Sequence, residues 1–452
     1  MPMTVLTELK SGDEIAKGGR WLAGGFVRYV LALLYAFVLC YAYDVISEWW
    51  AYFGFTYMLD DEWMLYVACA VAAIPAVLLT PRPSTFAQAS AWFLYILVFL
   101  PCMLVTVMQF SAGADAALKV FVSIFIGCLL FMVIARGEVH RWNVPEVPVR
   151  AFWLGLIGVW LVLMTLVLYS FRTSFQIVGA DDIYNQRFIG ASVTGNPIVR
   201  YSIALLASSI NPFMIGLGLF TRRYWVSAIG IGSQFVLFGT LAAKAVLLSP
   251  IFVVGVYFLG DKQHRMRGNL LLIGLLGVFV VTSPLLATYN PIGSDINQLT
   301  SLIYMRTLLI SGATFGVYEQ FFAIYPLTYF SNNNIISWFV TYPYGDLSVG
   351  QAVQSSLIAP TSADIGELNA NFLATDGVAA LGLWGVPVAA TFCALVLRFI
   401  SKLVPVERTM LFTACATGFL LSLANTSLLT SLVTGGGVIL TALVAVAPLK
   451  RK

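Results

Sequence analysis

The sequence predicts an all-α protein: a polytopic transmembrane helix bundle of about 12 spans, with one large external loop that itself contains helices. Composition is the first observation behind this prediction. Of the 452 residues, 60% are hydrophobic and only 10% are charged, whereas about a quarter of the residues of a soluble domain are charged. The mean hydropathy is +0.88. The other two observations are a series of long apolar runs and the placement of Lys and Arg between them.

The apolar runs are the second observation, because a span needs about 20 mostly apolar residues. The candidate spans are 24–43, 63–80, 88–110, 117–135, 151–171, 199–219, 224–242, 244–260, 268–287, 377–399, 409–427 and 429–447. Lys244 interrupts the stretch 224–260, which must therefore cross twice or bend. Since the runs follow one another almost without a break, we expect a single integral membrane domain over 1–452 and no separate soluble domain.

The third observation is that basic residues gather on one side when the spans are counted from an inner N-terminus, as the positive-inside rule requires. The predicted inner set is Lys10, Lys17, Arg20, Arg28, Arg82, Arg136, Arg141, Arg150, Arg222, Arg223, Lys262, Arg265, Arg267, Arg398, Lys402, Arg408, Lys450, Arg451 and Lys452. Both termini are therefore expected in the cytoplasm, with 1–23 as a cytoplasmic segment and 288–376 as the large external loop. No cleavage site follows a short apolar region near the N-terminus, so the first apolar segment should remain as a helix.

Residues 302–322 of this loop are apolar enough to be taken for a further span. If they crossed, the Lys and Arg after them would lie outside, against the rule. We therefore interpret 302–322 as an interfacial or re-entrant helix, which Gly312 and Gly316 would allow to bend.

Several function classes are disfavoured by what the chain contains. The six cysteines all fall inside apolar runs without metal-type spacing, and both histidines lie in basic loops on the inner side, so we expect no metal site and no disulfide framework. No nucleotide-binding loop is present, and the basic residues are not clustered on a polar surface, so no cofactor and no nucleic-acid partner are expected. Asp60, Asp61 and Glu62 remain a candidate cation site, with a solvated acidic turn as the alternative.

Six basic residues fall outside the topology pattern. They are Lys119, Arg172, Arg187, Arg200, Lys244 and Arg306. Arginines on the outer side suggest recognition of an anion, because the guanidinium group binds phosphate through two parallel hydrogen bonds. The alternative is that each pairs with a nearby acid or anchors a helix end at the membrane surface.

Three carboxylates of the external loop could act as a general base: Glu319, Glu367 and Asp376. Asp376 directly precedes an apolar run, where partial burial would raise its pKa. The alternative is that Thr375 or Asp376 is the N-cap of that run. The loop is also rich in aromatic residues and in Asn, which could bind sugar hydroxyls or, for the aromatic residues, mark a membrane interface.

Together these residues resemble a family. The run from Asn369 through Asp376 to Gly385 is similar to the segment that ends the large periplasmic loop of Wzy-type O-antigen and oligosaccharide repeat-unit polymerases, a family of the glycosyltransferase class C superfamily. Met305-Arg306 followed by 318–322 resembles the arginine and aromatic pattern earlier in that loop, and Ala243-Lys244 resembles the lysine-bearing span.

The resemblance implies a bacterial inner-membrane enzyme that transfers a growing glycan from undecaprenyl pyrophosphate to a lipid-linked oligosaccharide repeat unit at the periplasmic face. The expected partners are that lipid-linked oligosaccharide and the membrane lipid, with a chain-length regulator left open. The expected site residues are Arg306, Glu319 and Asp376 for catalysis; Arg187, Arg200, Lys244 and Arg306 for the pyrophosphate; and Tyr318, Asn369 and Asn371 for the glycan.

Three alternatives stay open. One is a polysaccharide-unit flippase, which would need its charges inside the bundle. The second is an O-antigen ligase, although Asn369 stands where the ligase has a histidine. The third is a polyprenyl-phosphate-sugar glycosyltransferase, which would depend on the acids 60–62 and a metal ion.

Overall fold

In a computed structural model, residues 3–59, 61–110, 114–176, 186, 190, 192–241, 244–261, 265–290, 295–333, 336–357 and 367–448 are described. Every regular element among them is a helix, which confirms the all-α prediction. The apolar content of the chain explains why, since a helix satisfies its own backbone groups and can be placed in lipid.

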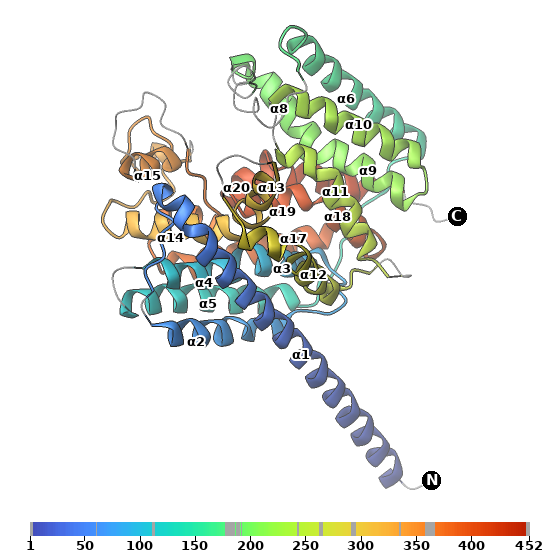
Figure 1. The fold of residues 1–452 in the computed structure, drawn as a ribbon. Helices are drawn as coiled ribbons and strands as arrows, with labels where there is room; N and C mark the ends of the chain where they lie inside the picture. Colours follow the sequence, from blue (N-terminus) through green and yellow to red (C-terminus); the bar gives the residue numbers. More distant parts are fainter. Residues whose placement is uncertain are drawn as a thin grey trace.

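The first group of helices surrounds one helix that is wholly buried. The group comprises α1 (Met3–Ser47), η1 (Glu48–Phe53), α2 (Glu62–Ala72), η2 (Ile74–Leu78), α3 (Phe86–Leu94), η3 (Tyr95–Phe99), α4 (Leu100–Gln109) and α5 (Ala114–Arg136). α3, η3 and α4 run on as one helix whose residues are all buried. Figure 1 shows α2, α4 and α5 side by side below α14.

A second group packs on the other side of the protein (Figure 1). It comprises α6 (Val149–Ser170), α8 (Pro197–Leu205), η5 (Leu206–Ile210), α9 (Asn211–Phe220), α10 (Tyr224–Leu241) and α11 (Lys244–Phe258). α9 and α10 form an antiparallel pair, and a Cβ atom on Gly230 would lie 2.8 Å from the Ile215 side chain. This glycine therefore lets the two backbones approach closely.

The chain then returns to the first group. This middle part comprises α12 (Gly268–Ala287), α13 (Asp295–Ile303), η6 (Tyr304–Leu309), α14 (Ile310–Phe322), η7 (Ile336–Trp338) and α15 (Val349–Leu357). α12 packs along α1, and α14 packs along α4.

The C-terminal part joins the two groups. It comprises η8 (Leu373–Val378), α16 (Ala379–Leu381), α17 (Gly385–Leu403), η9 (Val406–Arg408), α18 (Thr409–Cys415), α19 (Thr417–Leu423), α20 (Leu428–Val433) and α21 (Gly437–Val446). α17 lies against α5, while α18 contacts α3, α9 and α11.

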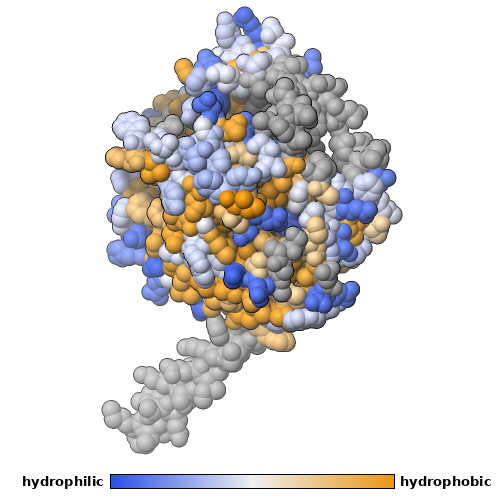
Figure 2. Space-filling model, turned by 90° about the vertical axis from the view of Figure 1, so that its left-hand side faces the viewer, coloured by the Kyte–Doolittle hydropathy of each residue, from blue (hydrophilic) through white to orange (hydrophobic). Residues whose placement is uncertain are grey.

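Eight described helices are long and apolar enough to cross a membrane, and the pair Val406–Cys415 and Thr417–Leu423, bent by 62°, would be a ninth. Three of the predicted spans fall outside this set: Glu62–Leu78 and Val246–Phe258 are shorter apolar helices, and 224–242 corresponds to α10. Exposed apolar side chains cover much of the middle of the face in Figure 2, with hydrophilic residues toward its margins. The chain is therefore a membrane protein by its helices.

The predicted span 377–399 is displaced in the structure. α17 begins at Gly385, and residues 377–381 belong to the preceding short helices η8 and α16. The break falls at Gly382, whose φ of 74° favours glycine. Hydropathy alone runs through this turn, because apolar residues stand on both sides of it.

Arginines of the predicted inner set bind backbone carbonyl groups at helix ends. Arg28 donates to the carbonyl oxygen of Val77 (3.0 Å), and Arg141 donates to those of Val404 (3.0 Å) and Ser84 (2.6 Å). Such carbonyls have no partner within their own helix, so a cation there satisfies them and favours the helix dipole.

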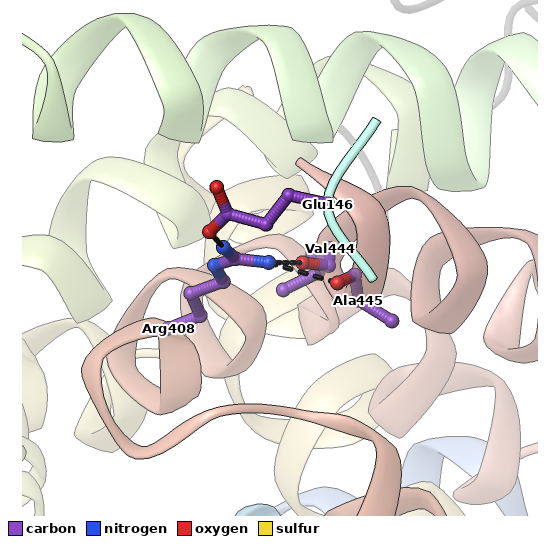
Figure 3. Close-up of polar contacts among 4 residues, drawn as sticks. All are labelled: Glu146, Arg408, Val444 and Ala445. Carbon is purple, nitrogen blue, oxygen red and sulfur yellow. Dashed lines mark hydrogen bonds and ion pairs between the residues drawn. The ribbon is translucent and has the colours of Figure 1, made fainter. Parts of the chain in front are cut away.

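Arg408 is the most buried of these caps after Arg28. Figure 3 shows its guanidinium group between the carboxylate of Glu146 and the last turn of α21. It donates to the carbonyl oxygens of Val444 (3.2 Å) and Ala445 (2.8 Å) and forms an ion pair with Glu146. The loop 137–148 is thereby tied to the C-terminal helices.

All six cysteines are free and buried, which confirms their interpretation as small buried side chains. The Sγ atoms of Cys40 in α1 and Cys69 in α2 lie 3.5 Å apart. The other cysteines have no such partner among the described residues.

This pair gives a test of the α1–α2 packing. Mild oxidation of the purified protein should link Cys40 and Cys69, because the sulfur atoms need to move by only about 1.5 Å to reach disulfide distance. Peptide mass spectrometry after proteolysis would detect the linked fragments. A link from Cys40 to any other cysteine would contradict the packing, and Cys69→Ser should abolish the product.

Candidate functional site

The candidate site is built on α14, which enters the bundle. A Cβ atom at Gly312 would overlap the Pro101 carbonyl, and one at Gly316 would overlap the Gln109 side chain, so both glycines serve close packing against α4. The expectation that these glycines bend the helix was wrong. The irregular part is the π-helical turn η6, which precedes them. Residues 302–322 therefore lie within the bundle and not along its surface.

A second segment, 367–381, lies against α14. Its fully buried Asn371 donates to the Ser311 carbonyl (2.7 Å), and the Asn371 side-chain oxygen accepts from the N–H groups of Leu373 (2.9 Å) and Ala374 (3.2 Å). The Tyr318 hydroxyl donates to the Leu368 carbonyl (2.8 Å). These bonds join the two segments at both ends of α14 and begin the helix η8.

The bonds of Asn371 predict a large effect on stability. Asn371→Ala should lower the free energy of unfolding by about 3 kcal/mol, because it removes a helix cap and leaves buried backbone groups unpaired. Asn369→Ala is the matched control, since Asn369 is exposed two positions earlier. Thermal unfolding in detergent would measure both. Equal stabilities of the two variants would contradict the buried arrangement.

Glu319 is the carboxylate of the site without a compensating partner. It is partly buried near the end of α14, one turn after Gly316, and among the described residues its carboxylate has no ion pair and no hydrogen bond. Burial raises the pKa of Glu319 from 4.5 to about 7. A carboxyl group with this pKa can accept a proton near neutral pH.

Asp376 lies in η8 and is bonded to another helix. Its carboxylate accepts the N–H of Leu428 (2.7 Å), the first residue of α20, and is close to Cys393 of α17. Burial raises the pKa of Asp376 to about 6, and the Leu428 hydrogen bond opposes the increase. The alternative that Asp376 caps its own apolar run was wrong, because it stands inside η8 and bonds the start of α20.

Arg306 is exposed on η6, and its guanidinium carbon lies 4.9 Å from the centre of the Trp50 ring. The Trp50 ring is buried and donates to the Tyr289 hydroxyl (3.3 Å), so it forms a fixed base under the arginine. No carboxylate among the described residues pairs with Arg306. Its charge is therefore available to an anion, and stacking on Trp50 orients the planar group.

The other predicted pyrophosphate residues lie elsewhere or cannot be placed. Arg200 is exposed on α8, which packs against α6 and η5, and its guanidinium group lies over the ring of the adjacent Tyr201. η6 packs instead against α1, α13 and α14. Arg187 lies outside the described residues, and Lys244 begins α11 with a side chain that is also outside them.

Aromatic residues that were predicted for the loop form a cluster at the end of α14. Its members are Tyr318, Phe321, Phe322, Tyr325, Tyr342 and Tyr344. The Tyr342 hydroxyl is buried and has no hydrogen-bond partner among the described residues. It is the polar atom of this cluster that a ligand hydroxyl could satisfy.

Two residues of the site were not predicted. Trp50 stands at the end of the first span, where an interfacial tryptophan needs no further explanation. Ser348 donates to the Glu367 carboxylate (2.9 Å), which engages one of the three candidate bases at the start of α15. An Asn, Ser or Asp before a helix is a capping signal, and it could have identified the roles of Asn371 and Ser348.

No group of three or more His, Cys, Asp or Glu side chains in the described part of the chain is arranged to hold a metal ion. Comparisons with protein-family models, with curated proteins and with solved structures find no match to this chain.

Proposed function

We propose that the protein is a membrane glycosyltransferase, a polymerase that transfers a growing glycan from undecaprenyl pyrophosphate to a lipid-linked oligosaccharide repeat unit at the periplasmic face of the bacterial inner membrane. The observation that carries this proposal is the juxtaposition of an unpaired cation and an unpaired carboxylate on one continuous helical stretch, η6 and α14. Arg306 is exposed without an ion pair, and Glu319 has a pKa raised to about 7.

The chemistry suits these two groups. Glu319 would take the proton from an acceptor sugar hydroxyl as its oxygen attacks the anomeric carbon of the donor glycan. The bond between that carbon and the pyrophosphate oxygen breaks, and Arg306 would stabilise the negative charge on the departing pyrophosphate. The products are a lengthened glycan on the acceptor lipid and free undecaprenyl pyrophosphate. Asp376, on η8 against α14, is the second candidate for the proton transfer.

The placement of the two segments supports a site that meets a lipid substrate. α14 and 367–381 reach into the helical bundle and are bonded to each other, so their polar groups are held among apolar helices. Irregular backbone at membrane depth is tolerated where it is buried in protein or lines a cavity. We infer that both segments are re-entrant, within the proposed external loop 288–376.

A flippase is the second candidate, and a specific observation favours it. α18 and α19 are bent by 62°, and the amide groups of the fully buried Asn211 have no partner among the described residues. Broken helices with buried polar groups are typical of transporters. The two candidates differ in their product, since a flippase moves the lipid-linked unit without forming a glycosidic bond.

The test is to incubate the purified protein, in vesicles, with a lipid-linked repeat unit. A ladder of lengthened glycans on a gel would support the polymerase. Single units that change membrane side without a ladder would overturn it in favour of the flippase. We expect chelation of divalent cations to leave the ladder intact, and a strict requirement for Mg²⁺ or Mn²⁺ would instead favour a polyprenyl-phosphate-sugar enzyme.

A further inference from the structure

The segment 323–345, called the strap here, connects α14 to α15. No Asp, Glu, Lys, Arg or His stands between Glu319 and Asp346. Its largest apolar side chains point away from the protein: Ile324 is 81% exposed, Trp338 is 85% exposed and Phe339 is 84% exposed. A soluble surface rarely gathers such residues without a partner.

The base of the strap is fixed to the turn before α17. The N–H and hydroxyl groups of Thr328 donate to the Ala379 carbonyl (2.8 and 3.0 Å), and the Tyr329 N–H donates to the Ala380 carbonyl (3.2 Å). The Leu327 side chain lies against Gly382. The strap therefore has a defined position on the protein.

That position lies at the depth of the membrane spans. The Ser123 hydroxyl, about two turns inside the candidate span Asp115–Arg136, donates to the carbonyl of Leu383 (2.7 Å). The turn that holds the strap is thus level with the interior of α5, about 12 Å along its axis.

An exposed apolar stripe continues from this turn along α17. Its members and their exposed fractions are Trp384 65%, Val388 55%, Phe392 56%, Leu395 50% and Phe399 47%. Their spacing of three and four places them on one face of a candidate span, Gly385–Leu403, and such a face is covered by lipid. The strap begins where this lipid-covered face ends.

We propose that the strap is an interfacial membrane anchor, with Ile324, Trp338 and Phe339 inserted among the phospholipids at the boundary between headgroups and acyl chains. Tryptophan is suited to that boundary, and an uncharged segment can lie in it without the cost of burying an ion. The absence of charge from 320 to 345 and the attachment beside the α17 stripe both favour lipid over water. The proposal goes beyond the glycosyltransferase function and does not depend on it.

The experiment uses the full chain in vesicles of phosphatidylethanolamine and phosphatidylglycerol. Trp338→Cys and Phe339→Cys are each labelled with the fluorophore NBD, and Asp346→Cys, at an exposed polar position, is the matched control. The six native cysteines are buried, so labelling of the unsubstituted protein gives the background. The expected result is blue-shifted emission at 338 and 339, quenching by lipids with a shallow nitroxide, and several-fold weaker quenching by aqueous iodide than at 346.

Two outcomes would overturn the anchor. Quenching by iodide at 338 and 339 equal to that at 346 would place the strap in water. Protection from both iodide and the nitroxide lipid would mean that protein, such as a second copy of this chain, covers it. Thermal unfolding of each labelled variant in detergent shows whether the fold is intact, as expected for side chains that are more than four-fifths exposed.

Discussion

Glu319→Gln is expected to reduce polymer formation about 10²- to 10⁴-fold, the range that a positioned general base contributes. The substitution keeps the shape of the side chain and removes its ability to accept the proton. Because the carboxylate of Glu319 has no hydrogen bond or ion pair among the described residues, few protein contacts are lost. The measurement is the rate of ladder formation from a lipid-linked repeat unit.

The pH dependence of this activity follows from the pKa of Glu319, which is about 7. A base must be deprotonated, so the rate should rise as the pH increases through about 7 and then level off. In Glu319→Gln the residual rate should lose this rise. If Asp376 is the base, the rise falls near pH 6 and remains in Glu319→Gln.

The same pKa shift affects stability in the opposite direction. Folding raises the pKa of Glu319 from 4.5 to about 7, so the folded state binds more protons than the unfolded state between these values. The free energy of unfolding should therefore decrease as the pH rises from 4.5 to about 7. Glu319→Gln should lose this part of the decrease, and unfolding by denaturant across that range would show it.

A matched control and a contradicting result complete this test. Gln320→Ala changes an exposed neighbour on the same helix and should leave the rate unchanged. Full activity of Glu319→Gln together with an unaltered pH profile would remove Glu319 from the mechanism. Loss of the folded protein in both variants would instead show that the end of α14 is structurally fragile, which thermal unfolding distinguishes from a catalytic loss.

Periodicity and hydropathy predict the helical class because they report how each stretch meets lipid or the core. They fail where a turn is hidden in an apolar stretch. Gly377 and Gly385 look like parts of one span, yet the backbone turns at Gly382 and brings Gly377 against Gly385. The re-entrant segment 367–381 thus depends on a local glycine conformation and on packing against α14, and neither is visible in the average hydropathy.

The candidate site shows the same limit. Asn369 and Asn371 are the same residue type two positions apart, but one is exposed and the other is fully buried with both ends of its amide bonded. The geometry favours a positioning role for Asn371, and its predicted contact with glycan stays a prediction. Trp50 and Arg306 are distant in the sequence, and only the packing of η6 against α1 could reveal that they meet.

Arg306→Ala is expected to abolish polymer while single repeat units remain attached to their lipid. The departing pyrophosphate would lose its counter-charge, and removal of one such electrostatic contact typically lowers a rate by about 10²- to 10³-fold. The exposed side chain carries little of the fold, so the variant should unfold at nearly the same temperature as the original protein. Analysis of lipid-linked glycan lengths would measure the effect.

Two further substitutions separate charge from orientation at Arg306. Arg306→Lys keeps the charge but loses the planar group that stacks on Trp50 and binds phosphate through two bonds, so an intermediate rate is expected. Arg172→Ala is the matched control, because Arg172 is also exposed and lies 4.6 Å from the centre of the Tyr169 ring at the end of α6. If Arg172→Ala and Arg306→Ala reduce polymer equally, the effect reflects positive charge in general. If only Arg306→Ala does so, the stack on Trp50 marks where the pyrophosphate binds, because the remaining difference between the two arginines is their place in the fold.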